Sequence, residues 1–499
     1  MNISATPPEG RSRVDGDQVI RVETLIVGAG FGGLGMGIRL ARRGDTSFVI
    51  LERASDVGGT WRDNVYPGVA CDIPSHLYSF SFRPKADWSH YYASGPEIHG
   101  YLTECARAEG LLDHLRLDTE VLDMRWDESI HSWSVTTTGG SYQCSVLVVA
   151  AGRLSEPRFP EVSGLESFPG DIIHSSQWND GVDLQGARVG VVGTGASAVQ
   201  LVPQLARVAS SVVIFQRTAS YVVPRNDFEY GKTELRLFEK DPTSLKRLRS
   251  RLFWNAEIGF AARTGIPAHR AGLRAGALEH LRQQVPDARL RAALTPNYEI
   301  GCKRILLSDD FYPALSVGAV TLEPSALSSV SGEHAIAASG ARHQLDVLVF
   351  ATGFHTTEPP FAHRVFGREG VPLAERWRNG MVAYASTTVH AFPNMFVIDG
   401  PNASLGHNSA VYMIEAQIDY ILAACDYRTS SGVGVLAVSR EAEDAYVTEL
   451  DHRSASTVWL DGGCESWYVD SRSGRLTLLW PDFAFAFRER LDVFDVRAY

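Results

Sequence analysis

A glycine-rich pattern occurs twice along the chain, as Gly28-Ala-Gly30-Phe-Gly-Gly33 and as Gly193-Thr-Gly195-Ala-Ser-Ala198. Each copy follows a short apolar run and precedes a helical pattern. In such a turn the glycines let the backbone approach a pyrophosphate, and the helix N-terminus supplies partial positive charge. Two copies predict two βαβ units, and therefore an α/β fold with two Rossmann-like dinucleotide-binding domains. Two dinucleotides in one chain are typical of an enzyme that passes electrons from a nicotinamide to a flavin.

The residues after the second strand of each unit distinguish the two cofactors. Glu52 ends the first unit, where an acid binds the ribose diol of FAD or NAD. The second unit ends in Gln216, Arg217 and Thr218, with no acid. An arginine at this place pairs with a 2′-phosphate, so the pattern favours NADPH over NADH. A solvent-exposed arginine without a ligand is the alternative for Arg217.

Composition excludes several classes of function. The net charge is −11 and no block of Lys and Arg occurs, which argues against a nucleic-acid partner. The six cysteines are widely spaced and form no C-x-x-C pair, so we expect buried or idle thiols, no redox dithiol and no metal site. No apolar run reaches the roughly 18 residues of a membrane span. We therefore expect a cytoplasmic protein without a membrane partner.

The order of strand-like and helix-like segments predicts domains that are split along the chain. The stretch 226–299 is rich in Leu, Arg, Ala and Glu, which indicates an inserted helical subdomain. The expected segments are a flexible N-terminal tail (1–19), the first part of the FAD-binding domain (20–156), the first part of the NADPH-binding domain (157–225), the helical subdomain (226–299), and the second parts of the NADPH-binding domain (300–353) and the FAD-binding domain (354–499).

Further motifs lie along the chain before and after the second glycine pattern. Phe168-Pro-Gly170-Asp-Ile-Ile-His174-Ser-Ser-Gln-Trp178 precedes it, and a Gly-Thr-Trp signature occupies 58–72. With Cys302-Lys303-Arg304 and Glu465-Ser466-Trp467-Tyr468, these motifs make nearly the whole chain resemble the type I Baeyer–Villiger monooxygenases. That family consists of FAD- and NADPH-dependent enzymes that insert oxygen beside a ketone. The chain departs from the family at Asn179, where a proline is frequent, and at Arg153, where a glutamine is common.

The resemblance implies a catalytic pair. Arg304 would be the fixed cation beside a nucleophilic C4a-peroxyflavin, because a guanidinium stays charged without titrating. It would also stabilise the alkoxide that forms on the ketone. Asp72 would orient Arg304 and balance its charge. A structural salt bridge for Arg304 and a turn-forming role for Asp72 are the alternatives.

The resemblance also assigns residues to the cofactors. Lys303 would meet the 2′-phosphate together with Arg217 and Thr218, and Trp467 would contact the nicotinamide cofactor, unless it is a core tryptophan. We expect His174 to anchor the linker between the two cofactor domains rather than to act as a general base. The full set of predicted cofactor-binding residues is Gly28, Gly30, Phe31, Gly33, Glu52, Arg53, Gly59, Thr60, Trp61, Asp72, Tyr78, Gly193, Thr194, Gly195, Ser197, Arg217, Thr218, Lys303 and Trp467.

The predicted activity is the oxygenation of a small-molecule ketone to an ester or lactone with NADPH and O₂. A sulfide or amine oxygenase of the same superfamily is the nearest rival. A flavin disulfide reductase is disfavoured by the absence of a close cysteine pair in the sequence. A non-catalytic, redox-sensing flavoprotein is a rival of another class, and it predicts negligible NADPH consumption with any ketone. The identity of the ketone and the oligomeric state are not encoded in these motifs.

Overall fold

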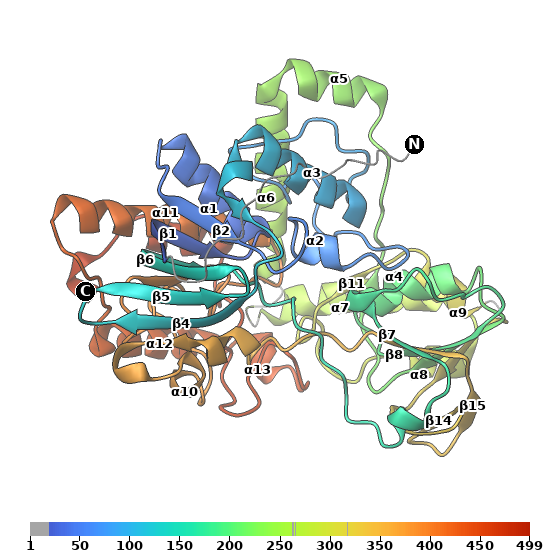
Figure 1. Cartoon of the computed structure of the whole chain (residues 1–499). Coiled ribbons are helices and arrows are strands. Elements are labelled where there is room, and N and C mark those ends of the chain that lie inside the picture. The colour runs from blue at the N-terminus through green and yellow to red at the C-terminus, as the bar shows by residue number, and fades with distance from the viewer. Residues whose placement is uncertain (1–18, 262–263, 265, 317) are drawn as a thin grey trace, which may run out of the picture.

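The structure, a computed structural model, describes residues 19–261, 264, 266–316 and 318–499. The tail expected at 1–19 therefore lies outside the described residues except for Val19. Two β-sheets form the centres of two bodies that lie side by side (Figure 1). The α/β fold class predicted from the two glycine patterns is confirmed.

The first sheet carries the first glycine turn. Its strand order is β17-β4-β5-β6-β1-β2-β3, and β18 pairs with β6. Leu25 and Ile26 are adjacent on β1 and belong to the apolar cores on opposite faces of the sheet. The strands are β1 (Ile20–Val27), β2 (Phe48–Leu51), β3 (Leu115–Arg116), β4 (Val121–Asp127), β5 (Ser132–Thr137), β6 (Gly140–Val149), β17 (Val365–Phe366) and β18 (Met395–Val397).

The second sheet carries the second glycine turn and is parallel throughout, in the order β12-β9-β8-β16-β7. Apolar clusters cover both of its faces, as parallel sheets require. A small antiparallel sheet and a parallel strand pair complete this body. The strands are β7 (Asp171–His174), β8 (Arg188–Val192), β9 (Ser211–Phe215), β10 (Val222–Val223), β11 (Leu306–Leu307), β12 (Val320–Glu323), β13 (Leu327–Ser331), β14 (His334–Ala337), β15 (Arg342–Gln344) and β16 (Val347–Phe350).

Both glycine turns depend on a glycine with positive φ directly after a strand. Gly28 has φ +100°, and a Cβ there would lie 2.5 Å from the carbonyl oxygen of Ala150. Gly193 has φ +114°, and a Cβ there would lie 2.6 Å from the carbonyl oxygen of Ala351. No other residue type fits these positions without strain. The chain consequently turns into helix α1 (Phe31–Arg42) in one body and α4 (Ala196–Leu205) in the other.

The helices of 226–299 divide between the two bodies. Phe238 and Leu245 join the core of the first sheet, whereas Leu281 and Leu290 pack on that of the second. Figure 1 shows α5 and α6 beside α3, with α7 nearer the second sheet. These helices are α5 (Lys232–Lys240), α6 (Pro242–Ala261), α7 (Pro267–Gln284) and α8 (Ala288–Ala293).

The remaining helices pack on both bodies, as α11 does on the first and α9 on the second. They are α2 (Thr60–Asp63), α3 (Gly95–Ala108), α9 (Phe311–Leu315), α10 (Leu373–Arg376), α11 (Ala410–Ser430), α12 (Arg440–Ser454), α13 (Val458–Asp461) and α14 (Ala484–Leu491). Single 3₁₀ turns occur at Leu111–His114, Leu165–Ser167, Ser175–Gln177, Pro360–Arg364, Arg368–Gly370 and Val496–Ala498. None of the helices among the described residues combines the length and apolarity that a bilayer span requires.

The two crossings between the bodies pair with each other. The N–H of Arg158 donates to the carbonyl oxygen of Gly353 at 2.9 Å, and the N–H of His355 donates to that of Glu156 at 3.0 Å. The chain therefore leaves the first body and returns to it along neighbouring segments.

The expectation of six unbonded cysteines is wrong for two of them. Cys302 and Cys464 form a disulfide across 162 residues of sequence. Spacing along the chain could not indicate this bond, because the fold alone brings the two segments together. The other four cysteines are free thiols: Cys71, Cys105 and Cys144 are buried and Cys425 is half-buried.

Candidate active site

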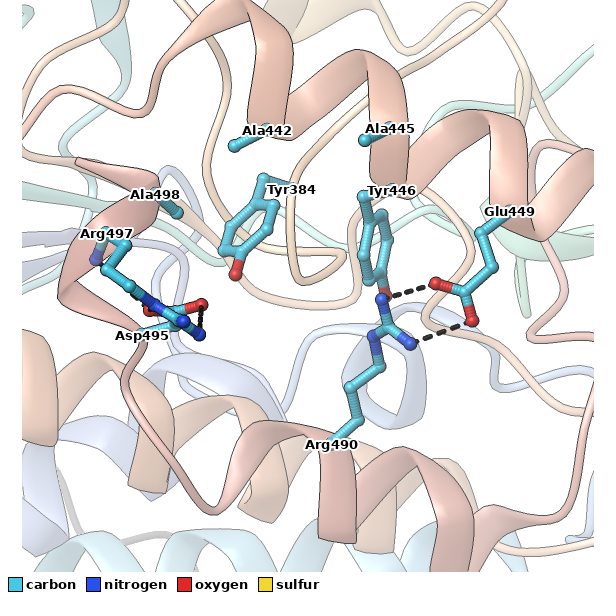
Figure 2. A pocket seen from close by; sticks show the side chains of 9 residues that line it. All are labelled: Tyr384, Ala442, Ala445, Tyr446, Glu449, Arg490, Asp495, Arg497 and Ala498. Atoms are coloured by element: carbon cyan, nitrogen blue, oxygen red, sulfur yellow. Dashed lines mark hydrogen bonds and ion pairs between the residues drawn. The ribbon is translucent and has the colours of Figure 1, made fainter.

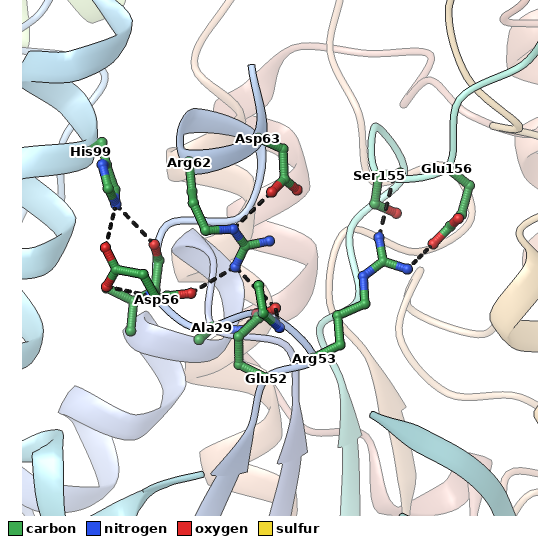
Figure 3. Close-up of polar contacts among 11 residues, drawn as sticks. Ala29, Glu52, Arg53, Asp56, Arg62, Asp63, His99, Ser155 and Glu156 are labelled. Atoms are coloured by element: carbon green, nitrogen blue, oxygen red, sulfur yellow. Dashed lines mark hydrogen bonds and ion pairs between the residues drawn. The ribbon is translucent and has the colours of Figure 1, made fainter. Parts of the chain in front are cut away.

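Glu52 lies at the end of β2 against the first glycine turn (Figure 3). Its carboxylate accepts hydrogen bonds from the N–H groups of Ala29 (2.9 Å) and Ala54 (3.0 Å), and it pairs with the Arg62 guanidinium at 3.0 Å. The side chain is 6% exposed. This network fixes the acid beside the turn, where a ribose diol would bind. Arg62 is a partner that sequence reasoning missed.

Aromatic side chains lie next to the first glycine turn. Gly59 packs against Gly30, and Thr60 begins the short helix α2. The Trp61 indole N–H donates to the Tyr78 hydroxyl at 3.2 Å, and the Tyr78 ring meets Phe31 edge-on at 5.2 Å. The structure thus brings the predicted residues of 28–33 and 59–78 together.

Arg53 lies apart from this cluster. It pairs with the Glu156 carboxylate and donates to the Ser155 carbonyl oxygen at 3.4 Å, at the start of the crossing between the bodies (Figure 3). Its side chain is exposed. A contact between Arg53 and a cofactor stays a prediction.

Arg304 and Asp72 form a two-pronged ion pair. Arg304 precedes β11 and Asp72 lies between α2 and α3, yet Nε and Nη2 of Arg304 donate to the two Asp72 oxygens at 2.8 and 2.7 Å. The Asp72 carboxylate raises the pKa of Arg304 above its ordinary value, against the opposing effect of burial, and nearby Tyr468 adds to the rise. The guanidinium is therefore a permanent and oriented cation between the two bodies.

The second glycine turn presents a helix N-terminus without acidic side chains. Gly195 is the residue before α4, and the first turn of that helix contains Ser197 and no acid. The Thr194 hydroxyl donates to the carbonyl oxygen of Thr218 at 2.9 Å, which joins the turn to the segment after β9. The N–H groups of this turn suit an anion.

Two cations come together at the same end of this sheet. Burial lowers the pKa of Lys303, and the adjacent charge of Arg217 lowers it further, while Glu465 opposes both effects. The Lys303 ammonium lies 5.2 Å from the centre of the Tyr298 ring. Like charges at close range destabilise each other unless an anion lies between them. This pair therefore fits a phosphate group.

Trp467 is not a core residue. Its side chain is 42% exposed, and its ring lies 4.4 Å from the ring of the buried Tyr468. The core alternative for Trp467 is thus excluded, while its contact with the nicotinamide cofactor stays a prediction. Tyr468 itself is near Arg304, a neighbour that no sequence pattern indicated.

His174 is buried in the crossing between the bodies. Its Nδ1 accepts a hydrogen bond from the N–H of Ser176 at 3.2 Å, and its ring lies within 5.9 Å of the rings of Phe159 and Phe354. Burial lowers the pKa of His174 to about 4. A neutral imidazole in this place supports the anchoring role predicted for it.

Two further contacts connect the site to its surroundings. Arg153 pairs with Asp399, and their side chains are only 15% and 17% exposed. The Tyr66 hydroxyl donates to Oε1 of Gln200 on α4 at 2.8 Å, which ties the 58–72 segment to the second body. The motif could have indicated Tyr66, whereas nothing in the sequence connects residues 153 and 399.

A surface pocket of about 400 Å³ lies elsewhere, between α12, α14 and the C-terminal residues (Figure 2). Its charged side chains already pair with each other, Arg490 with Glu449 at 2.7 Å and Arg497 with Asp495 at 2.9 Å. None of the predicted site residues is among those that line it. The candidate active site is therefore the region around Arg304, between the two glycine turns.

Comparisons with known proteins agree with this arrangement. The family model described as pyridine nucleotide-disulphide oxidoreductase matches residues 25–231. A Baeyer–Villiger monooxygenase of Streptomyces coelicolor is 42% identical over 482 residues, which is 96% of this chain and 92% of the relative. One of Pseudomonas aeruginosa is 40% identical over 478 residues, with 96% and 91% covered.

Solved structures of similar proteins share the fold. Cyclohexanone monooxygenase from Rhodococcus sp. Phi1, bound to NADP⁺, aligns with a TM-score of 0.85 at 27% identity, covering 95% of this chain and 97% of that one. Oxidised steroid monooxygenase bound to NADP aligns with a TM-score of 0.83 at 29% identity, covering 94% and 97%.

Proposed function

The chain belongs to the Baeyer–Villiger monooxygenase family, and from this premise we propose how its residues serve the NADPH- and O₂-dependent oxygenation of a ketone to an ester or lactone. The observation that carries the proposal is the oriented Arg304–Asp72 ion pair between the two glycine turns.

The two turns fit the two cofactors. The turn at 28–33, with Glu52 beside it, would hold FAD, and the turn at 193–198, with Arg217 and Lys303, would hold NADPH. When bound, the reduced flavin supplies the activation of O₂ for transfer of one oxygen atom to the ketone. The two like-charged side chains of Arg217 and Lys303 support an assignment to the 2′-phosphate.

Arg304 provides a fixed positive charge where negative charge develops on oxygen. A cation that is already oriented needs no reorganisation during the reaction, which is the main source of electrostatic catalysis. Asp72 binds Nε and Nη2 of Arg304 and so fixes the direction of Nη1, which carries two further N–H groups. Because the pKa of Arg304 is raised, the charge persists at any pH at which the protein is folded.

The test measures ester formation and NADPH oxidation separately, with a panel of cyclic, linear and aryl ketones and one thioether. For Arg304→Ala we expect ester formation to fall by about 10²–10³-fold, the size of effect seen when one preorganised donor to a developing oxyanion is removed. Arg304→Lys should recover only part of this loss, because an ammonium cannot form the same two-pronged pair. NADPH oxidation should continue in both variants, with hydrogen peroxide as the product.

A matched control is Arg188→Lys, since Arg188 makes a similar two-pronged pair with Asp346 away from the site. It should leave ester formation unchanged. If Arg304→Ala formed ester at the wild-type rate, the assignment of Arg304 would be wrong. Oxidation of the thioether with no ester from any ketone would favour the S-oxygenase. An absence of NADPH consumption with every substrate would favour the sensing flavoprotein.

A further inference from the structure

The Cys302–Cys464 disulfide joins two segments that both lead into the candidate active site. On one side Cys302 is followed directly by Lys303 and Arg304. On the other side Cys464 begins the segment of Glu465 and Trp467. The bond therefore lies two residues from the proposed catalytic cation and three residues from the tryptophan assigned to the nicotinamide cofactor.

The two segments are packed closely around the bond. Cys302 is fully buried in an apolar cluster that also contains Ile300, Val458 and Tyr468. The N–H of Glu299 donates to the carbonyl oxygen of Gly462 at 2.9 Å. A Cβ on Gly462 would lie 2.7 Å from the Cβ of Cys302, so only glycine allows this approach.

Residues of the arm that follows Cys464 (464–468) act on the charged groups of the arm that follows Cys302 (302–304). Glu465, next to Cys464, raises the pKa of Lys303, which burial and Arg217 lower. Tyr468, further along the same arm, raises the pKa of Arg304. The arm that carries Trp467 thus lies against the arm that carries both cations. A shift of one arm relative to the other would change the surroundings of both Lys303 and Arg304.

We propose that Cys302 and Cys464 are positioning residues, whose disulfide holds the 464–468 arm against the 302–304 arm in the geometry that binds NADPH. The proposal rests on the proposed function, because it assigns the 2′-phosphate to Lys303 and the nicotinamide cofactor to Trp467. Fixing a segment in its bound geometry removes part of the entropy that binding must otherwise overcome.

Because a disulfide can be reduced, the geometry that this bond holds also depends on its redox state. A dithiol reductant delivers two electrons and two protons, the S–S bond breaks, both sulfurs become thiols, and the reductant becomes a cyclic disulfide. Disulfides in reducing compartments are usually transient or regulatory. The affinity for NADPH would then depend on the ratio of dithiols to disulfides in the surroundings.

The first experiment counts thiols in the purified, FAD-loaded enzyme after unfolding in the presence of an alkylating agent. Of the six cysteines, four are free in the structure. We expect four alkylated residues without reductant and six after dithiothreitol, with Cys302 and Cys464 in one disulfide-linked peptide by mass spectrometry. Six alkylated residues without reductant would overturn the proposal.

The second experiment measures the dissociation constant for NADP⁺ on the oxidised holoenzyme, which requires no ketone and no turnover. We expect binding to weaken by about tenfold in the Cys302→Ser/Cys464→Ser variant and in wild type treated with dithiothreitol. Cys425→Ser is the matched control, since Cys425 is a free, half-buried thiol on α11. It should bind NADP⁺ like the wild type. Removal of the reductant followed by reoxidation should restore affinity in the wild type only.

The outcomes separate the two proposals. Wild-type affinity in the reduced enzyme and in the double variant would overturn the positioning role while leaving the proposed function intact. A wild type that forms no ester would contradict the proposed function, whatever the disulfide does. If the double variant does not fold, Cys464→Ser alone breaks the bond at its less buried end, and dithiothreitol on wild type gives the same measurement without substitution.

Discussion

At the scale of single residues, the proposed preference for NADPH rests on the closeness of Arg217 and Lys303. Arg217 follows β9 and Lys303 precedes β11, yet the two cations are close enough for Arg217 to lower the pKa of Lys303. Two positive charges at this range repel each other and cost stability unless a bound anion offsets the repulsion. The 2′-phosphate of NADPH would relieve this repulsion, whereas NADH lacks this group.

We therefore predict that Arg217→Ala raises the KM for NADPH by about thirtyfold, equivalent to about 2 kcal/mol for one charge-assisted hydrogen bond. The KM for NADH should stay unchanged, because NADH lacks the 2′-phosphate that we assign to Arg217. Steady-state kinetics with both cofactors measures this ratio. Arg207→Ala is the control, since Arg207 is an exposed arginine of the same body whose guanidinium donates to Gln204. Equal effects on NADPH and NADH would contradict the assignment.

At the scale of elements, the two glycines of the second turn differ: the backbone requires one of them, and the other leaves space for a ligand. Gly193 has positive φ and no room for a Cβ, because the Ala351 carbonyl oxygen would lie 2.6 Å away. Gly195 has φ −82°, and nothing lies within 4 Å of the Cβ it would carry. The first glycine is required by the backbone, whereas the second leaves open space where a pyrophosphate would approach.

This difference predicts opposite results for two alanine substitutions. Gly193→Ala should lower the melting temperature, because strain of about 1–3 kcal/mol is introduced at a positive φ and the close contact adds to it. Gly195→Ala should leave the melting temperature unchanged but weaken NADP⁺ binding, since its Cβ occupies the space for the phosphate. Calorimetry and ligand titration on both variants test the pair. A stable Gly193→Ala variant would show that the turn can relax.

The glycine turns also show which parts of the fold and of the candidate site could be predicted from sequence alone. The glycine turns were predictable, because strand, turn and helix are consecutive and follow local rules. The Arg304–Asp72 pair was expected only from the family resemblance, since 232 residues separate its members. The Arg153–Asp399 pair and the Cys302–Cys464 bond were not predicted, because they connect segments 246 and 162 residues apart that no local pattern relates.

At the scale of the whole molecule, a buried carboxylate ties the helical segment to the first body. Glu257 on α6 is 2% exposed and accepts hydrogen bonds from Nδ2 of Asn408 at 2.6 Å and from the N–H of Phe485 at 3.3 Å. Its carboxylate also lies 3.1 Å from Nε2 of His407. Burial alone would raise the pKa of Glu257, but the partners His407 and Asn408 lower it below its ordinary value.

The sign of this pKa shift predicts how stability depends on pH. A carboxyl whose pKa is lower in the folded than in the unfolded state stabilises the fold above its unfolded pKa, near 4.3 for a glutamate, and loses that contribution as pH falls through the folded value. Glu257→Gln keeps the shape but has no charge to lose. We expect this variant to be less stable at pH 7 and its free energy of unfolding to decline less steeply below about pH 5 than that of the wild type.

Glu257→Ala should be less stable still, by about 3–5 kcal/mol at pH 7, because its buried partners lose their acceptor. Urea denaturation at a series of pH values measures all three proteins, and Glu279→Gln on the exposed face of α7 is the control. Parallel pH curves for wild type and Glu257→Gln would mean that the charge of Glu257 contributes nothing to stability. A gap that narrows toward acid would mean that the ionised carboxylate of Glu257 stabilises the fold at neutral pH, through the contacts that join α6 to Asn408 and Phe485.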